Sequence, residues 1–362
     1  MKKRVAGIVS VTLALCLVAL PACTQSQDTV QEEEKTFSEG ADTACEVTGY
    51  TDFNAAHPGY FLQKGDRVAV ISPSALPSRE QVDATVAGLK EWGYTPVEGE
   101  HVCEEERTLE ECKADLTWAL EDSSIKAIYC VRGGYGANEV MDALSVDDIR
   151  AADKPIIGYS DITVYHSAWT VAGLPSVHSS MSATFMDLPE ECAEVQSRLM
   201  QGEVPSYSCT TNEHCKPGAA EGVLIGGNLS TLTAVLNTAY DCTKTEEPYI
   251  LFVEDVGEDM QHIHRYLTIL RNRGVLKGAA GIVFGEWADT PQDFEDYDGS
   301  GRGGTFASVA DMIDREFLQD IEVPVAFGFP AGHADRNYPL LMGETARLDV
   351  SEDTFALEWL SE

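Results

Sequence analysis

The sequence predicts an α/β protein, in which a doubly wound parallel-sheet domain precedes a smaller mixed α/β domain that is rich in strands. Three observations support this fold class. Short β-branched runs alternate with segments of helical spacing through the first half of the chain. Glycine-bearing turns follow two of these runs, at residues 133–136 and at residue 158. Strand-like runs, such as residues 346–350 and 354–359, then dominate toward the C-terminus.

The parallel-sheet domain, of the flavodoxin-like type, is predicted over residues 61–204. Its first run, at 67–71, is followed by a helix that begins at Ser78, a favourable N-cap, and repeats apolar residues at Val82, Val86 and Leu89. Further strands are expected at 95–97, 125–131 and 155–157, and helices at 109–120, 138–144 and 162–171. Because both glycine-bearing turns follow strands, they are expected at the carboxyl edge of the sheet, where such sheets bind ligands.

A polar segment at residues 205–219 interrupts the alternation. It contains Pro205 and Pro217 and shows no helical period, so it is predicted to be a linker between the domains. The second domain is predicted over residues 220–362. Its strands are expected at 222–225, 249–253, 281–284, 323–327, 346–350 and 354–359, and its helices at 230–236, 261–271 and 309–317.

The first 60 residues are predicted to lie outside both domains. Residues 1–22 resemble a secretory signal peptide, with a basic start, an apolar stretch and small residues at the cut. The sequence before Cys23 resembles a lipobox, which predicts cleavage there and a lipid on the cysteine sulfur; ordinary cleavage near Ala22 is the alternative. Residues 23–60 are acidic and poor in large apolar side chains, and are predicted to be a disordered tether.

This N-terminus predicts an extracytoplasmic protein that is held at the cell membrane by its lipid anchor alone. No other stretch is long and apolar enough to span a bilayer. The formal net charge of −35 argues against binding of nucleic acid or of anionic lipid by electrostatic attraction.

The cysteines permit disulfides outside the cytoplasm. Cys16 would leave with the signal peptide and Cys23 would carry lipid, so an even number remains of the ten. Local spacing suggests the pairs Cys209–Cys215 and Cys103–Cys112, but leaves the connectivity open. No Cys-x-x-Cys motif occurs, so a zinc site made of cysteines is not expected.

The sequence Gly158-Tyr159-Ser160-Asp161 is typical of a nucleophile elbow. It lies between an apolar run and a helix-like segment, and such a turn presents the serine hydroxyl at the carboxyl edge of the sheet. Gly-x-Ser also occurs in many ordinary loops. The motif therefore predicts a catalytic serine only if a base, an orienting carboxylate and an oxyanion pocket accompany it.

Three further segments could supply those parts. The apolar run at 249–253 ends on Glu254 and Asp255, a glycine-rich turn carries His333, and Gly133 and Gly134 could form a nest of backbone N–H groups for an anion. Each has an ordinary alternative: a strand exit to solvent, an exposed loop histidine and a tight turn.

Together with Ser160, these segments resemble the LD-carboxypeptidase family of serine peptidases, which includes the microcin-immunity hydrolases. The resemblance runs from about residue 65 to residue 350. It rests on Gly65-Asp66-Arg67-Val68-Ala69-Val70, Arg132-Gly133-Gly134-Tyr135-Gly136, Ile157-Gly158-Tyr159-Ser160-Asp161-Ile162-Thr163, Gly226-Gly227-Asn228-Leu229-Ser230, Phe252-Val253-Glu254-Asp255 and Gly328-Phe329-Pro330-Ala331-Gly332-His333.

The resemblance implies that Ser160 is the nucleophile, His333 the general base and Glu254 the residue that orients the histidine. A serine hydroxyl needs a neutral imidazole to take its proton, and the imidazolium formed needs a carboxylate to stabilise it. The candidate oxyanion donors are the backbone N–H of Asp161 and that of Gly134 or Gly133. The Asp161 side chain could equally cap the following helix. No metal or organic cofactor is implied, and the family suggests a homodimer.

The resemblance implies hydrolysis of the bond between an L-configured centre and the terminal D-alanine of murein tetrapeptides. Two alternatives are a microcin-type peptidyl-nucleotide hydrolase and a non-catalytic solute-binding lipoprotein. The chain departs from the family pattern at Ala137-Asn138-Glu139, in place of the usual hydroxyl residue and arginine, and at Ser179-Ser180, in place of Gly-Pro. Both departures are expected near the substrate cleft and bear on selectivity.

Overall fold

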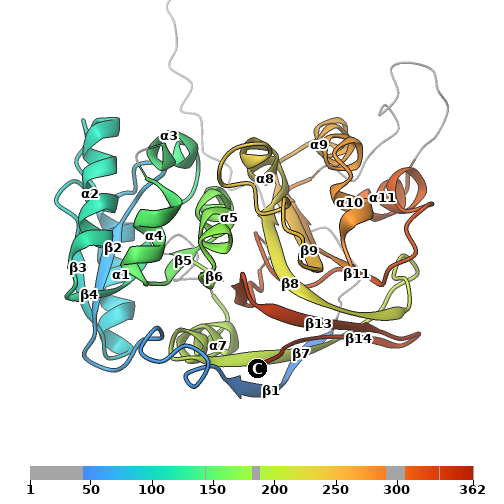
Figure 1. Cartoon of the computed structure of the whole chain (residues 1–362), viewed down its shortest axis with the longest axis horizontal. Helices are drawn as coiled ribbons and strands as arrows, with labels where there is room; N and C mark the ends of the chain where they lie inside the picture. Colours follow the sequence, from blue (N-terminus) through green and yellow to red (C-terminus); the bar gives the residue numbers. More distant parts are fainter. Residues whose placement is uncertain (1–43, 143, 182–187, 291–305, 334, 362) are drawn as a thin grey trace, which may run out of the picture. The chain divides into compact units, whose positions relative to one another are not determined.

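The computed structural model describes residues 44–142, 144–181, 188–290, 306–333 and 335–361 (Figure 1). The predicted signal peptide and Cys23 lie outside these residues. Within them, no helix is long and apolar enough to cross a membrane. The described strands form two sheets, and the mixed α/β fold class is confirmed.

The first sheet has the strand order β12-β6-β5-β4-β2-β3 and is parallel except at β12. Its strands are β2 (Arg67–Ile71), β3 (Thr95–Glu98), β4 (Ile125–Cys130), β5 (Ile156–Gly158), β6 (Ser176–His178) and β12 (Leu340–Met342). The chain runs from β2 to β3 and then returns to β4 on the other side of β2. The order of the strands therefore reverses between β2 and β4, and parallel sheets bind ligands beside the carboxyl ends of such strands.

Helices cover both faces of this sheet, which makes it doubly wound. They are α1 (Arg79–Glu91), α2 (Leu109–Glu121), α3 (Ala137–Met141), α4 (Val146–Ala152), α5 (Thr163–Ala172) and α7 (Glu190–Met200). Along β2, Ala69 and Ile71 share a core cluster with α2 and α5, whereas Val68 and Val70 share the other cluster with α1 and α7. Successive side chains of one strand thus serve two layers of helices.

The second sheet has the order β1-β7-β14-β13-β8-β9-β10-β11. Its strands are β1 (Cys45–Asp52), β7 (Glu203–Thr210), β8 (Gly218–Asn228), β9 (Tyr249–Val256), β10 (Gly281–Ala288), β11 (Val325–Phe327), β13 (Thr345–Val350) and β14 (Thr354–Trp359). The part from β8 to β11 is parallel and carries α8 (Leu229–Val235), α9 (Met260–Asn272), α10 (Val275–Gly278) and α11 (Val309–Phe317), whereas the part from β1 to β8 is antiparallel. The antiparallel part gives this region the strand-rich character that the sequence predicts.

The prediction of a disordered tether over residues 23–60 is wrong at its C-terminal end. Strand β1 pairs with β7 along its whole length, and Phe53 and Tyr60 are buried. A disulfide between Cys45 and Cys209 joins the two strands. The local pair Cys209–Cys215 is therefore wrong, because partners in neighbouring strands can be far apart in the sequence. The pair Cys103–Cys112 is also wrong, since both of these cysteines are free.

The prediction of a linker over residues 205–219 is wrong at both ends. Residues 205–210 belong to β7, whose Tyr207 and Cys209 are buried, and residues 218–219 begin β8. The polar residues that suggested a linker alternate with these buried ones, as in a strand with one solvated face.

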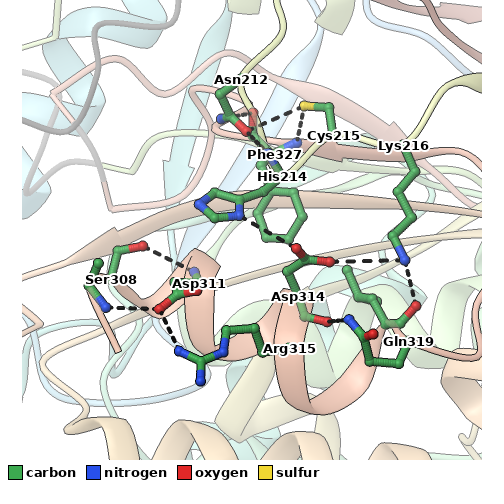
Figure 2. Close-up of polar contacts among 12 residues, drawn as sticks. Asn212, His214, Cys215, Lys216, Ser308, Asp311, Asp314, Arg315, Gln319 and Phe327 are labelled. Carbon is green, nitrogen blue, oxygen red and sulfur yellow. Dashed lines mark hydrogen bonds and ion pairs between the residues drawn. The ribbon is translucent and has the colours of Figure 1, made fainter. Parts of the chain in front are cut away.

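The turn between β7 and β8 is tied to its neighbours by several contacts (Figure 2). Asp314 of α11 lies 3.8 Å from His214 and 4.0 Å from Lys216, and the Lys216 ammonium donates to the Leu318 carbonyl. The Phe327 backbone N–H donates to the Cys215 sulfur at 3.4 Å. These contacts fix residues 212–216 against α11 and β11.

The two sheets meet where α5 of the first sheet packs on β8 and α8 of the second. Thr163, at the start of α5, accepts a hydrogen bond from the backbone N–H of Asn228 at 2.9 Å. Gly227 lies so close that a Cβ atom there would come within 2.4 Å of the Thr163 hydroxyl. This close approach joins the segment after Ser160 to the end of β8.

Candidate active site

Ser160 lies at the turn that follows β5, as the elbow motif predicts. It begins a 3-10 turn, Ser160–Ile162, that leads directly into α5. Its φ is +65°, a left-handed conformation that is uncommon outside glycine and that marks functional turns. The side chain is half-buried. The backbone therefore holds Ser160 in the strained strand-to-helix geometry of a nucleophile elbow.

Gly133 and Asp161 lie against this serine. A Cβ atom on Gly133 would be 2.9 Å from the Ser160 Cβ, 3.1 Å from its Oγ and 3.3 Å from the Asp161 nitrogen. Gly134 has a φ of +106° and packs on Ala75, which follows β2. The turns after β2, β4 and β5 thus converge, and Gly133 lies beside Ser160 and the backbone nitrogen of Asp161.

The Asp161 side chain does not take part in the predicted oxyanion site; it binds neighbouring turns instead. One of its oxygens accepts hydrogen bonds from the Ser74 hydroxyl at 2.5 Å and from the Ala137 backbone N–H at 2.9 Å. It therefore caps α3 rather than the following helix. Burial raises the pKa of Asp161, and the two hydrogen bonds partly offset that rise. The carboxyl group holds the turns after β2 and β4 to the elbow.

Glu254 and His333 form a hydrogen-bonded pair. Nδ1 of His333 lies 2.7 Å from Oε2 of Glu254, which is fully buried near the end of β9. With Nδ1 donating to the carboxylate, Nε2 is the ring atom left to accept a proton. Burial alone would lower the pKa of His333, but the charge of Glu254 and its hydrogen bond raise it overall. This pairing is what a general base and its orienting acid require.

Glycines bring the loop that carries His333 onto this carboxylate. Gly332 has a φ of +108°, and a Cβ atom there would lie 2.4 Å from Oε2 of Glu254. Gly285 of β10 is similarly close, at 2.9 Å from the Glu254 Cβ. Side chains at these positions would push the loop and the neighbouring strand away from the acid.

Tyr159 connects the two halves of the site. Its ring centroid lies 4.7 Å from that of His333, and Tyr159 directly precedes Ser160. The histidine from the second sheet's loop therefore packs on the elbow of the first sheet. Sequence reasoning treated Tyr159 as a spacer and missed this contact.

Sequence reasoning also missed Asn337. Its side chain is buried, and its Oδ1 accepts a hydrogen bond from the Gly332 backbone N–H at 2.9 Å. This bond closes the loop around His333. An Asn four residues after a predicted histidine base, in a glycine- and proline-rich loop, is the only signal that the sequence offers.

Asp255, beside the orienting acid, has a structural role. Its carboxylate accepts hydrogen bonds from the Asn228 amide at 2.8 Å and from the Ser230 backbone N–H at 2.9 Å, at the start of α8. Burial and, next, the charge of Glu254 raise the pKa of Asp255 to about 6. Of the two acids near the end of β9, only Glu254 forms a hydrogen bond with His333.

Three of the five residues that depart from the family pattern are buried. Ala137 begins α3 in the core, and Ser179 and Ser180 are buried with hydroxyls that have no hydrogen-bond partner among the described residues. The ring of the neighbouring His178 is also buried without a hydrogen-bond partner in the described part of the chain, and burial lowers its pKa well below the usual value. Among these departures, Asn138 and Glu139 are exposed.

Comparison with known proteins identifies the family to which the chain is similar. Residues 68–179 match the model of the LD-carboxypeptidase N-terminal domain, and residues 221–348 match that of the LD-carboxypeptidase C-terminal domain. A Streptomyces coelicolor relative is 32% identical over 308 residues, which cover 82% of this chain and 94% of the relative. The murein tetrapeptide carboxypeptidase of Pseudomonas aeruginosa is 31% identical over 301 residues, covering 78% and 93%.

Solved structures show the same fold. Muramoyltetrapeptide carboxypeptidase from Oxalobacter formigenes aligns with a TM-score of 0.69 at 24% identity, over 82% of this chain and 99% of that one. The microcin C7 self-immunity protein aligns with a TM-score of 0.67 at 21% identity, over 83% and 98%. The two family models match in chain order, the first across the Ser160 elbow and the second across Glu254 and His333, and the chain belongs to the LD-carboxypeptidase family of serine peptidases.

Proposed function

We propose that this protein is a serine LD-carboxypeptidase that releases D-alanine from murein tetrapeptides through an acyl-enzyme. The observation that carries the proposal is the 2.7 Å bond between His333 and Glu254, on a ring that packs against Tyr159 beside Ser160. The relative from Pseudomonas aeruginosa is named for this substrate. The leaving group would be the terminal D-alanine, attached to an L-configured centre.

In the first half of the proposed reaction, Nε2 of His333 takes the proton of the Ser160 hydroxyl as Oγ attacks the scissile carbonyl. Glu254 holds Nδ1 and stabilises the imidazolium that forms. The backbone N–H of Asp161, with that of Gly133 or Gly134, would stabilise the tetrahedral oxyanion, and one such donor is typically worth about 3–4 kcal/mol of barrier.

In the second half, the imidazolium gives its proton to the departing amine, so D-alanine leaves as a neutral amine and the acyl group stays on Ser160. His333 then takes a proton from a water molecule, which attacks the ester carbonyl. Collapse of that intermediate returns the proton to Oγ and releases the tripeptide.

The experiment that tests this proposal incubates the purified full chain with murein tetrapeptide and measures free D-alanine. We expect release by the wild type and a loss of about 10⁵- to 10⁶-fold in kcat for Ser160→Ala. Binding without turnover would instead favour a solute-binding lipoprotein. Hydrolysis of a peptidyl-nucleotide but not of the tetrapeptide would favour the microcin-type activity.

We also propose that the protein acts outside the cytoplasm, anchored by a lipid on Cys23. The lipobox-like sequence supports this placement, and so does the Cys45–Cys209 disulfide, since such bonds persist in oxidising compartments. The homodimer that the family resemblance suggests stays a prediction.

A further inference from the structure

The geometry of the site points to Arg132 as the residue that binds the free terminal carboxylate of the substrate, and this inference rests on the proposed carboxypeptidase function. In such a substrate the carboxylate carbon is two covalent bonds beyond the scissile nitrogen, so the charge lies within a few ångströms of the reacting carbonyl. The second sheet contributes two buried acids nearby, Glu254 and Asp255, and the chain carries a formal net charge of −35. A substrate anion in these surroundings requires a cation.

Among the described residues, three arginines contact or belong to the turns that surround Ser160 and His333. The guanidinium of Arg107 donates to the carbonyls of Ser72, Val102 and Ser74, and so serves the turn after β2. Arg336, in the loop of His333, lies 3.3 Å from Glu191. Both are therefore engaged by groups of the protein itself.

Arg132 is differently placed. Its Nη1 donates one hydrogen bond, at 2.8 Å, to the Leu76 carbonyl, and it forms no ion pair with any carboxylate of the described residues. The side chain is exposed. A guanidinium has five N–H donors, so most of them remain available to a bidentate carboxylate.

The position of Arg132 in the chain places its backbone beside the turn that contacts the reacting serine. It directly precedes Gly133, where a Cβ atom would be 3.1 Å from the Ser160 Oγ. Its acceptor Leu76 follows Ala75, on which Gly134 packs. Arg132 therefore follows β4, the strand next to β5, and stands beside the predicted oxyanion glycines, and we infer that its side chain extends from there to the terminal carboxylate of the substrate.

The test compares two substrates in wild type and in Arg132→Gln. One is murein tetrapeptide with its free terminal carboxylate, and the other carries a terminal D-alanine amide in its place. We expect the wild type to prefer the acid, and Arg132→Gln to lose about 10²- to 10³-fold in kcat/KM on the acid while changing little on the amide. Arg132→Lys keeps the charge but not the planar fork, so it should retain part of the preference.

The matched control is Arg347→Gln. Arg347 is an exposed arginine of β13 that pairs with Glu221 at 3.3 Å, and its loss should leave both substrates unaffected. Equal losses on acid and amide in Arg132→Gln, or an unchanged preference for the acid, would overturn the role of Arg132 alone. Release of D-alanine or its amide from neither substrate by the wild type would overturn the proposed function, and the carboxylate site with it.

Discussion

Ser160 is presented by consecutive residues at the end of one strand, whereas Glu254 and His333 are 79 positions apart and belong to a strand and a distant loop. The elbow half of the site is thus built locally, by backbone geometry at β5, with one glycine from the turn after β4. The acid–histidine half is built by packing, because the loop of His333 must be pressed onto β9. The elbow, which we call the local half, can be recognised from a short motif. The Glu254–His333 pair, which we call the packed half, can be recognised only when the fold that brings its residues together is known.

Both halves nevertheless contain a glycine at a position where a Cβ atom would collide with a predicted catalytic residue. Gly133 makes room for Ser160, and Gly332 makes room for Glu254. The two differ in backbone conformation, since only Gly332 has a φ in the left-handed region, at +108°. Alanine at Gly332 should therefore lower both activity and stability, whereas alanine at Gly133 should mainly lower activity.

The largest effect is expected from Glu254→Gln, which removes the charge of the packed half and preserves its shape. Without the carboxylate, the histidine loses both its tautomer preference and the stabilisation of its imidazolium. We expect kcat for D-alanine release to fall by about 10⁴-fold. Circular dichroism and thermal unfolding of the same variant check that the fold persists. A loss of less than tenfold in a folded variant would show that the acid does not serve the histidine.

Next in size are the two glycine substitutions, which compare the halves directly. In Gly332→Ala, the methyl group would lie 2.4 Å from the Glu254 carboxylate, and alanine at this φ adds backbone strain of about 1–3 kcal/mol. We therefore expect a lower melting temperature together with a fall of about 10²-fold or more in kcat. Thermal unfolding and single-turnover kinetics measure both quantities.

In Gly133→Ala, the methyl group would displace Ser160, at 2.9 Å between the Cβ atoms, with no left-handed φ to strain. We expect a loss of about 10²-fold in kcat, with a smaller fall in melting temperature than in Gly332→Ala. If Gly133→Ala lowered the melting temperature as much as Gly332→Ala, the distinction between a local half and a packed half would fail.

The sequence was most informative where the chain is local. The glycine-bearing turns, the elbow and the N-cap at Ser78 are short-range patterns, and each is found at its predicted strand end or helix start. Strand β1 and the Cys45–Cys209 disulfide depend on a partner 164 positions away, which no spacing rule reaches. Asn337 escaped notice for a similar reason, because its partner Gly332 matters only once the loop is packed on β9.

The smallest effect concerns the charges around His333. The neutral ring is the base, and because the pKa of His333 is raised above 6.5, the acid limb of kcat/KM should rise through a pH above that value. Burial opposes the rise in the pKa of His333, and Glu254 is the main cause of that rise. Asp289 contributes least among the causes that raise this pKa. Asp289 is exposed and has a φ of +50°, which asparagine also adopts readily. Asp289→Asn should therefore move the acid limb slightly toward lower pH and leave the plateau of kcat/KM unchanged.

The dependence on salt concentration distinguishes the weak effect of the Asp289 charge from that of the hydrogen-bonded Glu254 carboxylate. The shift caused by Asp289→Asn should disappear in high salt, which screens exposed charges, whereas the wild-type limb should stay above pH 6.5 because the buried Glu254 is screened much less. The pH profile of D-alanine release, measured at low and at high ionic strength for both proteins, checks this. A limb that moved below pH 6.5 in high salt would mean that exposed acids, and not the packed carboxylate, set the basicity of His333.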